Sequence, residues 1–135
     1  MLRAVESRDG YVAKEYMKIA KTVLVVDDNI DAADMTAEVL RMHGMTVAVA
    51  YGGPDGLEKA RTLLPSVIFL DIGMPLMDGC AVASALRKDQ AFQSVKLVAL
   101  TAWGDQESRE RIQAAGFDLH LTKPASLATL IQVAQ

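Results

Sequence analysis

The stretch KTVLVVDDNIDAAD, Lys21–Asp34, decides the fold. Its core, Val23–Val26, is a run of four aliphatic residues without polar alternation, which is typical of a strand covered on both faces of a sheet. The run ends in two adjacent acids, Asp27 and Asp28. Neighbouring carboxylates repel each other, and burying even one of them is unfavourable. The stretch therefore predicts a buried strand whose carboxyl end needs a compensating positive charge.

Similar apolar segments recur along the chain, in alternation with helical patterns. The predicted strands are Thr22–Asp27, Thr46–Ala50, Val67–Asp71, Lys96–Thr101 and Asp118–Thr122. The predicted helices are Asp31–His43, a segment from Pro54 to before Pro65, Gly79–Lys88, Asp105–Ala115 and Leu127–Ala134. Strands that alternate with helices imply parallel βαβ units with right-handed crossovers. Because the strands are apolar throughout, we expect helices on both faces, in a doubly wound three-layer α/β sandwich.

The ends of the predicted helices carry recognisable residues. Gly44 and Gly116 follow two helical patterns and suit the left-handed position after a helix. Pro54 suits a first helical turn, and Ser126 is a candidate N-cap for the last helix.

The bulk composition excludes several classes of protein. The chain has 135 residues, a formal net charge of −3 and a pI near 5.3, without the basic footprint of a nucleic-acid-binding protein. Its single cysteine, Cys80, excludes an internal disulfide and favours a reducing compartment. No apolar run approaches the roughly 18 residues of a membrane span, and no signal peptide is evident. We expect a cytoplasmic protein without membrane insertion or direct nucleic-acid binding: an N-terminal extension or linker, residues 1–20, and one domain, residues 21–135.

Polar residues follow four of the five predicted strands. Asp27 ends the first strand and Asp28 follows it, Asp71 ends the third, Thr101 ends the fourth and Lys123 follows the fifth. Each of them alone is more typical of a turn, a cap or a solvated surface side chain. In a doubly wound sheet, however, ligands bind outside the carboxyl ends of the strands. We therefore expect three carboxylates, a hydroxyl and an ammonium to converge at one edge.

This set of groups suits phosphoryl transfer. Clustered carboxylates favour Mg²⁺, which typically binds one or two carboxylates together with water molecules. The ion would offset the repulsion among Asp27, Asp28 and Asp71. A carboxylate can then act as nucleophile and form an acyl phosphate. The Lys123 ammonium and the Thr101 hydroxyl would neutralise the oxygens of the transferred group.

The motifs VLVVDDN, VIFLDIGMPLMDG, LVALTA and HLTKP, in this order, resemble the receiver domain of two-component response regulators. The resemblance covers about residues 21–135. It implies a flavodoxin-like topology with strand order 2-1-3-4-5 and five helices. It also implies a phosphorylation-activated switch that accepts a phosphoryl group from a sensor histidine kinase or a histidine phosphotransfer protein, catalyses this transfer itself, and then binds a downstream target protein.

The resemblance assigns roles residue by residue. It makes Asp71 the phosphoacceptor and Asp28 a direct Mg²⁺ ligand, with Asp27 holding metal-bound water and the Gly73 carbonyl completing the site. Thr101 and Lys123 would contact the phosphoryl group, and the peptide bond between Lys123 and Pro124 would be cis.

One position, His120, departs from the family pattern, and Trp103, Met74 and Met77 carry further expectations about exposure and packing. His120 occupies the place where the family usually has the switch Tyr or Phe, so it is either a half-exposed strand histidine or a rotameric switch with a polar tip. Trp103, two residues after Thr101, is expected to be exposed at the rim of the site or on a partner-binding surface. Met74 and Met77 are expected to fill the core.

Alternative functions fit the sequence less well. A phosphatase with an aspartate nucleophile usually carries a second acid two residues after the first, where this chain has Gly73. An FMN carrier would need a phosphate-binding loop after the first strand, where two acids would repel the ligand. A receiver module of a hybrid histidine kinase, used mainly as a protein-interaction scaffold, is the alternative that stays open.

Overall fold

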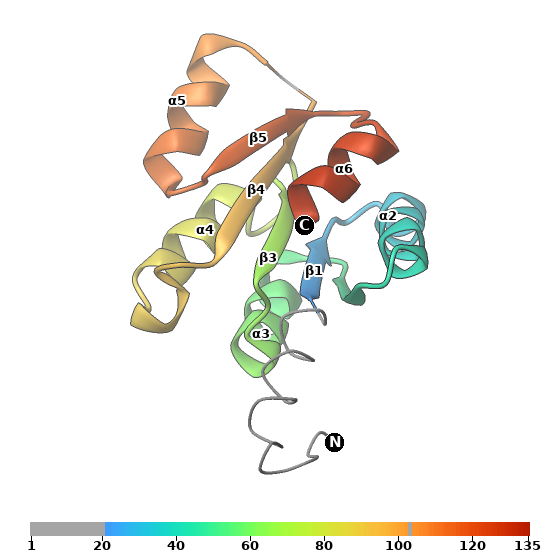
Figure 1. Ribbon diagram of the computed structural model, residues 1–135. Coiled ribbons are helices and arrows are strands. Elements are labelled where there is room, and N and C mark those ends of the chain that lie inside the picture. Colours follow the sequence, from blue (N-terminus) through green and yellow to red (C-terminus); the bar gives the residue numbers. More distant parts are fainter. Residues whose placement is uncertain (1–20, 103) are drawn as a thin grey trace.

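Five parallel strands form one sheet in the order β2-β1-β3-β4-β5 (Figure 1), in a computed structural model that describes residues 21–102 and 104–135. The strands are β1 (Thr22–Val26), β2 (Thr46–Ala50), β3 (Val67–Asp71), β4 (Lys96–Thr101) and β5 (Leu119–Thr122). The helices are α2 (Ile30–Met42), α3 (Gly53–Leu63), α4 (Gly79–Arg87), α5 (Gln106–Ala115), α6 (Leu127–Ala134) and the short 3₁₀ helix η1 (Gln90–Phe92). The predicted doubly wound sandwich, with its strand order and five α-helices, is confirmed.

The alternation of side chains along the strands builds two apolar cores. Val23 and Val25 of β1 face the core beneath α2 and α6, whereas Leu24 and Val26 face the core beneath α3, α4 and α5. Phe69 of β3 belongs to the first core. All four residues of the β1 run are fully buried, because both faces of the central strands are covered. The sequence-based expectation for this run is confirmed.

The two edge strands are covered less completely than the central ones. In β5, Leu119, His120 and Thr122 are exposed, and β2 is only partly buried. β5 pairs with β4 alone, so it has one bare edge, and its side chains are covered less completely than those of β3.

Helix ends follow the residues that the sequence singled out, within one or two positions. Gly44 and Gly116 have φ values of 86° and 97°, in the left-handed region that favours glycine. Pro54 lies in the first turn of α3, and the Ser126 side chain accepts a hydrogen bond from the N–H of Thr129. The helix η1 was not predicted; it follows α4 and buries Phe92.

The two ends of the described chain meet at the amino edge of the sheet. Nζ of Lys21 donates to the main-chain oxygen of Gln135, with 2.7 Å between the atoms. Residues 1–20 lie outside the described residues, so their assignment as an extension or linker stays a prediction. Within residues 21–102 and 104–135, none of the helices has the length and apolar character of a membrane span.

Candidate functional site

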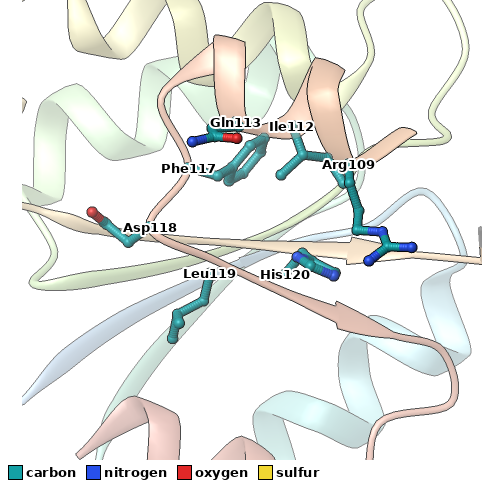
Figure 2. Close-up of a pocket in the computed structure, with 7 residues that line it drawn as sticks. All are labelled: Arg109, Ile112, Gln113, Phe117, Asp118, Leu119 and His120. Atoms are coloured by element: carbon teal, nitrogen blue, oxygen red, sulfur yellow. The ribbon is translucent and has the colours of Figure 1, made fainter. Parts of the chain in front are cut away.

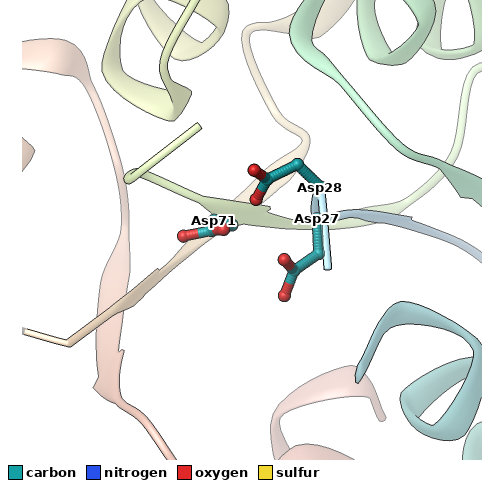
Figure 3. Close-up of side chains that lie close together, drawn as sticks. All are labelled: Asp27, Asp28 and Asp71. Carbon is teal, nitrogen blue, oxygen red and sulfur yellow. The ribbon is translucent and has the colours of Figure 1, made fainter. Parts of the chain in front are cut away.

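Three carboxylates meet at the carboxyl edge of the sheet (Figure 3). Asp71 is the last residue of β3, and Asp27 and Asp28 follow the neighbouring strand β1. One carboxylate oxygen from each lies within 4.8 Å of the others. Asp27 and Asp71 are buried, whereas Asp28 is exposed. The pairing of β1 with β3 therefore brings together the acids that the sequence placed at separate strand ends.

Lys123 joins two of these carboxylates. Its Nζ lies 3.2 Å from Oδ2 of Asp27 and 3.3 Å from Oδ2 of Asp71. The main-chain N–H of Lys123 donates to the carbonyl oxygen of Thr101, which fixes the end of β5 against the end of β4. The peptide bond between Lys123 and Pro124 is cis, as the resemblance implied. Lys123 thus supplies the positive charge that the two buried acids need.

The site shifts the pKa values of its two buried acids in opposite directions. Burial raises the pKa of Asp27 above its ordinary value, and the nearby Asp71 adds to this effect. Burial alone would also raise the pKa of Asp71, but the N–H of Gly73, the Asp27 side chain and Lys123 together hold that pKa below its ordinary value. For Lys123, the two carboxylates outweigh burial and raise the pKa of the ammonium. Of the two buried acids, Asp71 is therefore the one that stays ionised more easily.

Main-chain groups orient the two acids. The N–H of Gly73 donates to Oδ1 of Asp71 at 3.0 Å, which leaves Oδ2 to Lys123. The N–H of Asn29 donates to Oδ1 of Asp27 at the same distance. A Cβ at Gly79 would lie 2.5 Å from the carbonyl oxygen of Asp71, so the loop after β3 can pack closely against the end of β3 because that position is glycine.

Thr101 ends β4 beside this cluster. It is fully buried, and its neighbour Leu100 is the register partner of Asp71. Thr101 is not the N-cap of the helix that follows it. That N-cap is Asp105, whose side chain accepts a hydrogen bond from the N–H of Ser108.

His120 lies outside the cluster, on the edge strand. It is exposed and lines a shallow hollow between β5 and α5, together with Arg109, Ile112 and Phe117 (Figure 2). This placement agrees with an exposed strand histidine, and its role as a rotameric switch stays a prediction. Trp103 lies outside the described residues. Met74 is buried and Met77 packs against the core beneath α3 and α4, as expected.

The donor set fits a hard divalent cation. Three carboxylates, two of them buried, face a single ammonium from Lys123, so negative charge is left over at the cluster. Oxygen ligands of this kind suit Mg²⁺. Asp27, Asp28 and Asp71 are the residues that would hold the ion, and a contribution from the Gly73 carbonyl stays a prediction.

Comparison with known families identifies the domain. The profile of the response regulator receiver domain matches residues 23–135. The chain belongs to this family. The receiver is 38% identical over 109 residues to the transcriptional regulatory protein PrrA of Mycobacterium tuberculosis, which covers 81% of this chain and 46% of PrrA.

Other relatives are similar over the same domain. The receiver is 32% identical to hybrid signal transduction histidine kinase D of Dictyostelium discoideum, over 90% of this chain but only 8% of the kinase. The structure of the chemotaxis protein CheY4 of Vibrio cholerae matches with a TM-score of 0.80 at 30% identity, covering 84% of this chain and 94% of CheY4. The chain thus spans less than half the length of PrrA and of the hybrid kinase.

Sequence reasoning missed several residues that shape the receiver. Asn29 and Asp78 cap α2 and α4 through their side chains. Arg87 donates to main-chain oxygens of Gly116 and Phe92 and pairs with Asp118. An Asx residue directly before a helical pattern was a usable signal for both caps. Arg87 gave no signal for its contacts with Gly116 and Asp118, because these two partners are distant in sequence.

Proposed function

We propose that this receiver accepts a phosphoryl group from a phosphohistidine on a sensor histidine kinase or a histidine phosphotransfer protein. Asp71 is the proposed acceptor and phosphorylation the signal that changes partner binding. The observation that carries the proposal is the placement of Asp71. Its Oδ2 lies 3.3 Å from Nζ of Lys123, and one of its carboxylate oxygens lies within 4.8 Å of one oxygen each of Asp27 and Asp28.

The transfer needs one nucleophile and several neutralising groups. A carboxylate oxygen of Asp71 attacks phosphorus, the new O–P bond forms, and the N–P bond to the donor imidazole breaks with its electron pair returning to nitrogen. The N–H of Gly73, the Asp27 side chain and Lys123 offset the effect of burial and hold the pKa of Asp71 below its ordinary value, so the carboxylate is available for this attack at neutral pH. Lys123 already lies against Asp71 and can pair with an oxygen of the incoming group. The buried Thr101 hydroxyl is the proposed donor to a second oxygen.

A bound Mg²⁺ would neutralise negative charge on the phosphoryl oxygens. It would thereby reduce their repulsion from the nearby carboxylates during the transfer. Asp28, exposed beside the two buried acids, is the proposed direct ligand, and Asp27 the proposed holder of metal-bound water. The same residues would allow the receiver to catalyse loss of the group to water.

Phosphorylation would then bias an equilibrium between two arrangements of Thr101 and the elements after it. The proposed readout surface comprises α5, β5 and α6, and includes His120. The partners are a phosphohistidine protein and a downstream target protein, and we expect both to be met in the cytoplasm.

The alternative, a receiver module of a hybrid kinase that serves mainly as a scaffold, is not favoured. The relatives include a hybrid kinase, but also a transcriptional regulator and a chemotaxis protein. The cluster also keeps every group that transfer requires, which a scaffold would not need.

Intact-protein mass spectrometry after incubation with acetyl phosphate, with and without Mg²⁺, tests the proposal. A single Mg²⁺-dependent phosphoryl adduct is expected in the wild-type protein and none in Asp71→Asn. If neither acetyl phosphate nor a phosphorylated histidine phosphotransfer domain yields an adduct, the proposed function is wrong. An equal adduct in Asp71→Asn would reject Asp71 as the acceptor.

A further inference from the structure

Two cationic side chains bond to the outer side of the edge strand β2. Nη2 of Arg41 donates to the carbonyl oxygen of Val47 at 2.8 Å, and Nζ of Lys59 donates to the carbonyl oxygen of Val49 at 2.6 Å. Arg41 belongs to α2 and Lys59 to α3, and these helices pack on β2 from opposite faces of the sheet. The two cations therefore cover the same edge from both sides.

Val47 and Val49 are the residues of β2 whose main-chain groups point away from the sheet. β2 pairs only with β1, and in a parallel pair alternate residues bond to the neighbouring strand. The N–H of Thr46 and the carbonyl oxygen of Ala50 both bond to the chain segment that contains β1, so the groups of Val47 and Val49 face outward. A strand that added to this edge would need both of these carbonyl oxygens as acceptors. Arg41 and Lys59 already occupy them.

The segment around β2 has the composition of a strand that pairs readily. Its seven residues Met45–Tyr51, MTVAVAY, include no charged residue, proline or glycine. Such segments associate with other strands when they lie exposed at an edge. The other edge strand, β5, has only four residues and is bounded by Asp118 on one side and by Lys123–Pro124 on the other. Charge and proline protect that edge from within its own sequence, whereas β2 depends on side chains from the two helices.

Local partners are at hand for both cations without β2. Lys59 pairs with Asp55, one helical turn away, at 3.2 Å. Arg41 lies in the last turn of α2, where a cation can interact with the final carbonyl oxygens of its own helix. Both side chains nevertheless reach the outward carbonyl oxygens of the edge strand. Satisfaction of the two cations alone does not require this arrangement.

We propose that Arg41 and Lys59 hold the β2 edge closed, so that two copies of this chain do not pair through β2. The edge fits a second copy, because antiparallel pairing in the register that opposes Val47 to Val49 would satisfy the outward groups of both chains. The same register brings Arg41 of one copy toward Lys59 of the other. The two cations thus occupy the acceptors and also repel the second copy. The inference is independent of the proposed function, since β2 carries no residue of the Asp71 site.

The test removes both cations and compares four variants with wild type. Arg41→Met/Lys59→Met keeps apolar side chains of similar length and removes both donors and both charges. The matched control, Arg61→Met/Lys88→Met, makes the same change at two exposed cations at the C-terminal ends of α3 and α4. Arg41→Lys/Lys59→Arg retains both charges. The fourth variant adds Thr46→Lys to the double methionine variant, which places a charge at an exposed position of β2 itself.

Sedimentation velocity and amide hydrogen exchange measure the outcome. We expect the weight-average mass of Arg41→Met/Lys59→Met to rise with protein concentration beyond that of wild type. Exchange at the N–H groups of Val47 and Val49 should slow at least about tenfold in the associated form, because both become hydrogen-bonded. The N–H of Val25 in β1 should stay as protected as in wild type, which shows that the domain is folded. The other three variants should sediment like wild type.

A double methionine variant that sediments like wild type at every concentration would overturn the proposal. Association would also overturn it if exchange at Val47 and Val49 stayed unchanged, if the matched control associated equally, or if Thr46→Lys did not reverse it. Should Val25 lose its protection, the single variants Arg41→Met and Lys59→Met replace the double variant, and the same results decide.

Discussion

Lys123 forms an ion pair with Asp71 across the ends of two strands that are not neighbours, β5 and β3. The Nζ–Oδ2 distance is 3.3 Å, and the same nitrogen contacts Asp27 at 3.2 Å. One ammonium therefore compensates two buried acids.

Replacing Lys123 by methionine should destabilise the domain in the absence of divalent cations. Two buried carboxylates would lose their partner, and the Lys123 side chain is 31% exposed, so we expect a loss of about 1–3 kcal/mol, below the value for a fully buried pair. Urea denaturation measures this loss. Lys59→Met removes an exposed i,i+4 pair with Asp55 and a hydrogen bond to the Val49 carbonyl oxygen, and should cost less, about 0.5–1 kcal/mol. Equal losses would contradict a special role for the buried pair.

Addition of Mg²⁺ should raise the Tm of the wild-type domain. A ligand that binds only the folded state at ten times its Kd stabilises by about 1.4 kcal/mol. Asp28→Asn should reduce the shift, because it removes the exposed carboxylate of the cluster. Differential scanning calorimetry at constant ionic strength measures the effect. The same Mg²⁺-induced shift in wild type, Asp28→Asn and Asp71→Asn would show that the ion binds elsewhere.

Arg87→Met should destabilise the domain by about 2–4 kcal/mol. The mostly buried guanidinium donates to carbonyl oxygens of Phe92, Val95 and Gly116 and pairs with Asp118 at 2.9 Å. Hydrogen exchange should increase at the N–H of Leu97, which donates a hydrogen bond to the Asp118 carboxylate. Arg111→Met, which removes a more exposed pair with Asp78, is the control, with an expected loss near 0.5 kcal/mol. A similar loss in both variants would reject a structural role specific to Arg87.

Gly79→Ala should impair both stability and phosphorylation. Its Cβ would lie 2.5 Å from the Asp71 carbonyl oxygen and 2.9 Å from Cα of Ile72, so the backbone that carries Asp71, the proposed acceptor, must shift. We expect a loss of about 1–3 kcal/mol and slower labelling by acetyl phosphate. Gly52→Ser is the control, because a Cβ there has no neighbour within 4 Å and serine suits this N-cap. Wild-type labelling of Gly79→Ala would argue against close control of Asp71 by this loop.

The thiol of Cys80 should react slowly at neutral pH. Burial raises its pKa above the ordinary value of 9.0, so the folded domain favours the protonated thiol. The protonated thiol contributes its full stabilisation of the folded state at pH values below the ordinary pKa. This contribution is lost as the pH rises through the raised pKa of the folded domain. Iodoacetamide labelling followed from pH 7 to 10.5 should therefore rise later in the folded protein than in urea. Coincident profiles would contradict the shift.

The sequence predicted the fold because its local signals agree. The buried run of β1, the glycines after α2 and α5 and the prolines around α3 all indicate the same boundaries. Convergence of Asp27, Asp28, Asp71 and Lys123 followed from one topological rule, that the carboxyl ends of parallel strands share an edge.

What sequence reasoning could not predict depends on tertiary contact. The exposure of β5 follows from its edge position, which apolar residues alone do not reveal. The bonds from Arg87 to Gly116 and Asp118 join segments far apart in the chain. The left-handed backbone of Leu76 contradicts the preference of its own residue type, so no local rule could have found it.

The contact between Lys21 and Gln135 places the two ends of the domain side by side, at the edge of the sheet opposite Asp71. A polypeptide joined at either end would leave from that edge and would not obstruct Asp71. Neighbouring ends also mean that the domain fits into a loop of a host protein with short junctions, and that a circularly permuted chain could close its old termini with a few residues. The architecture thus suits a transferable module, able to work alone, in tandem or as an insertion.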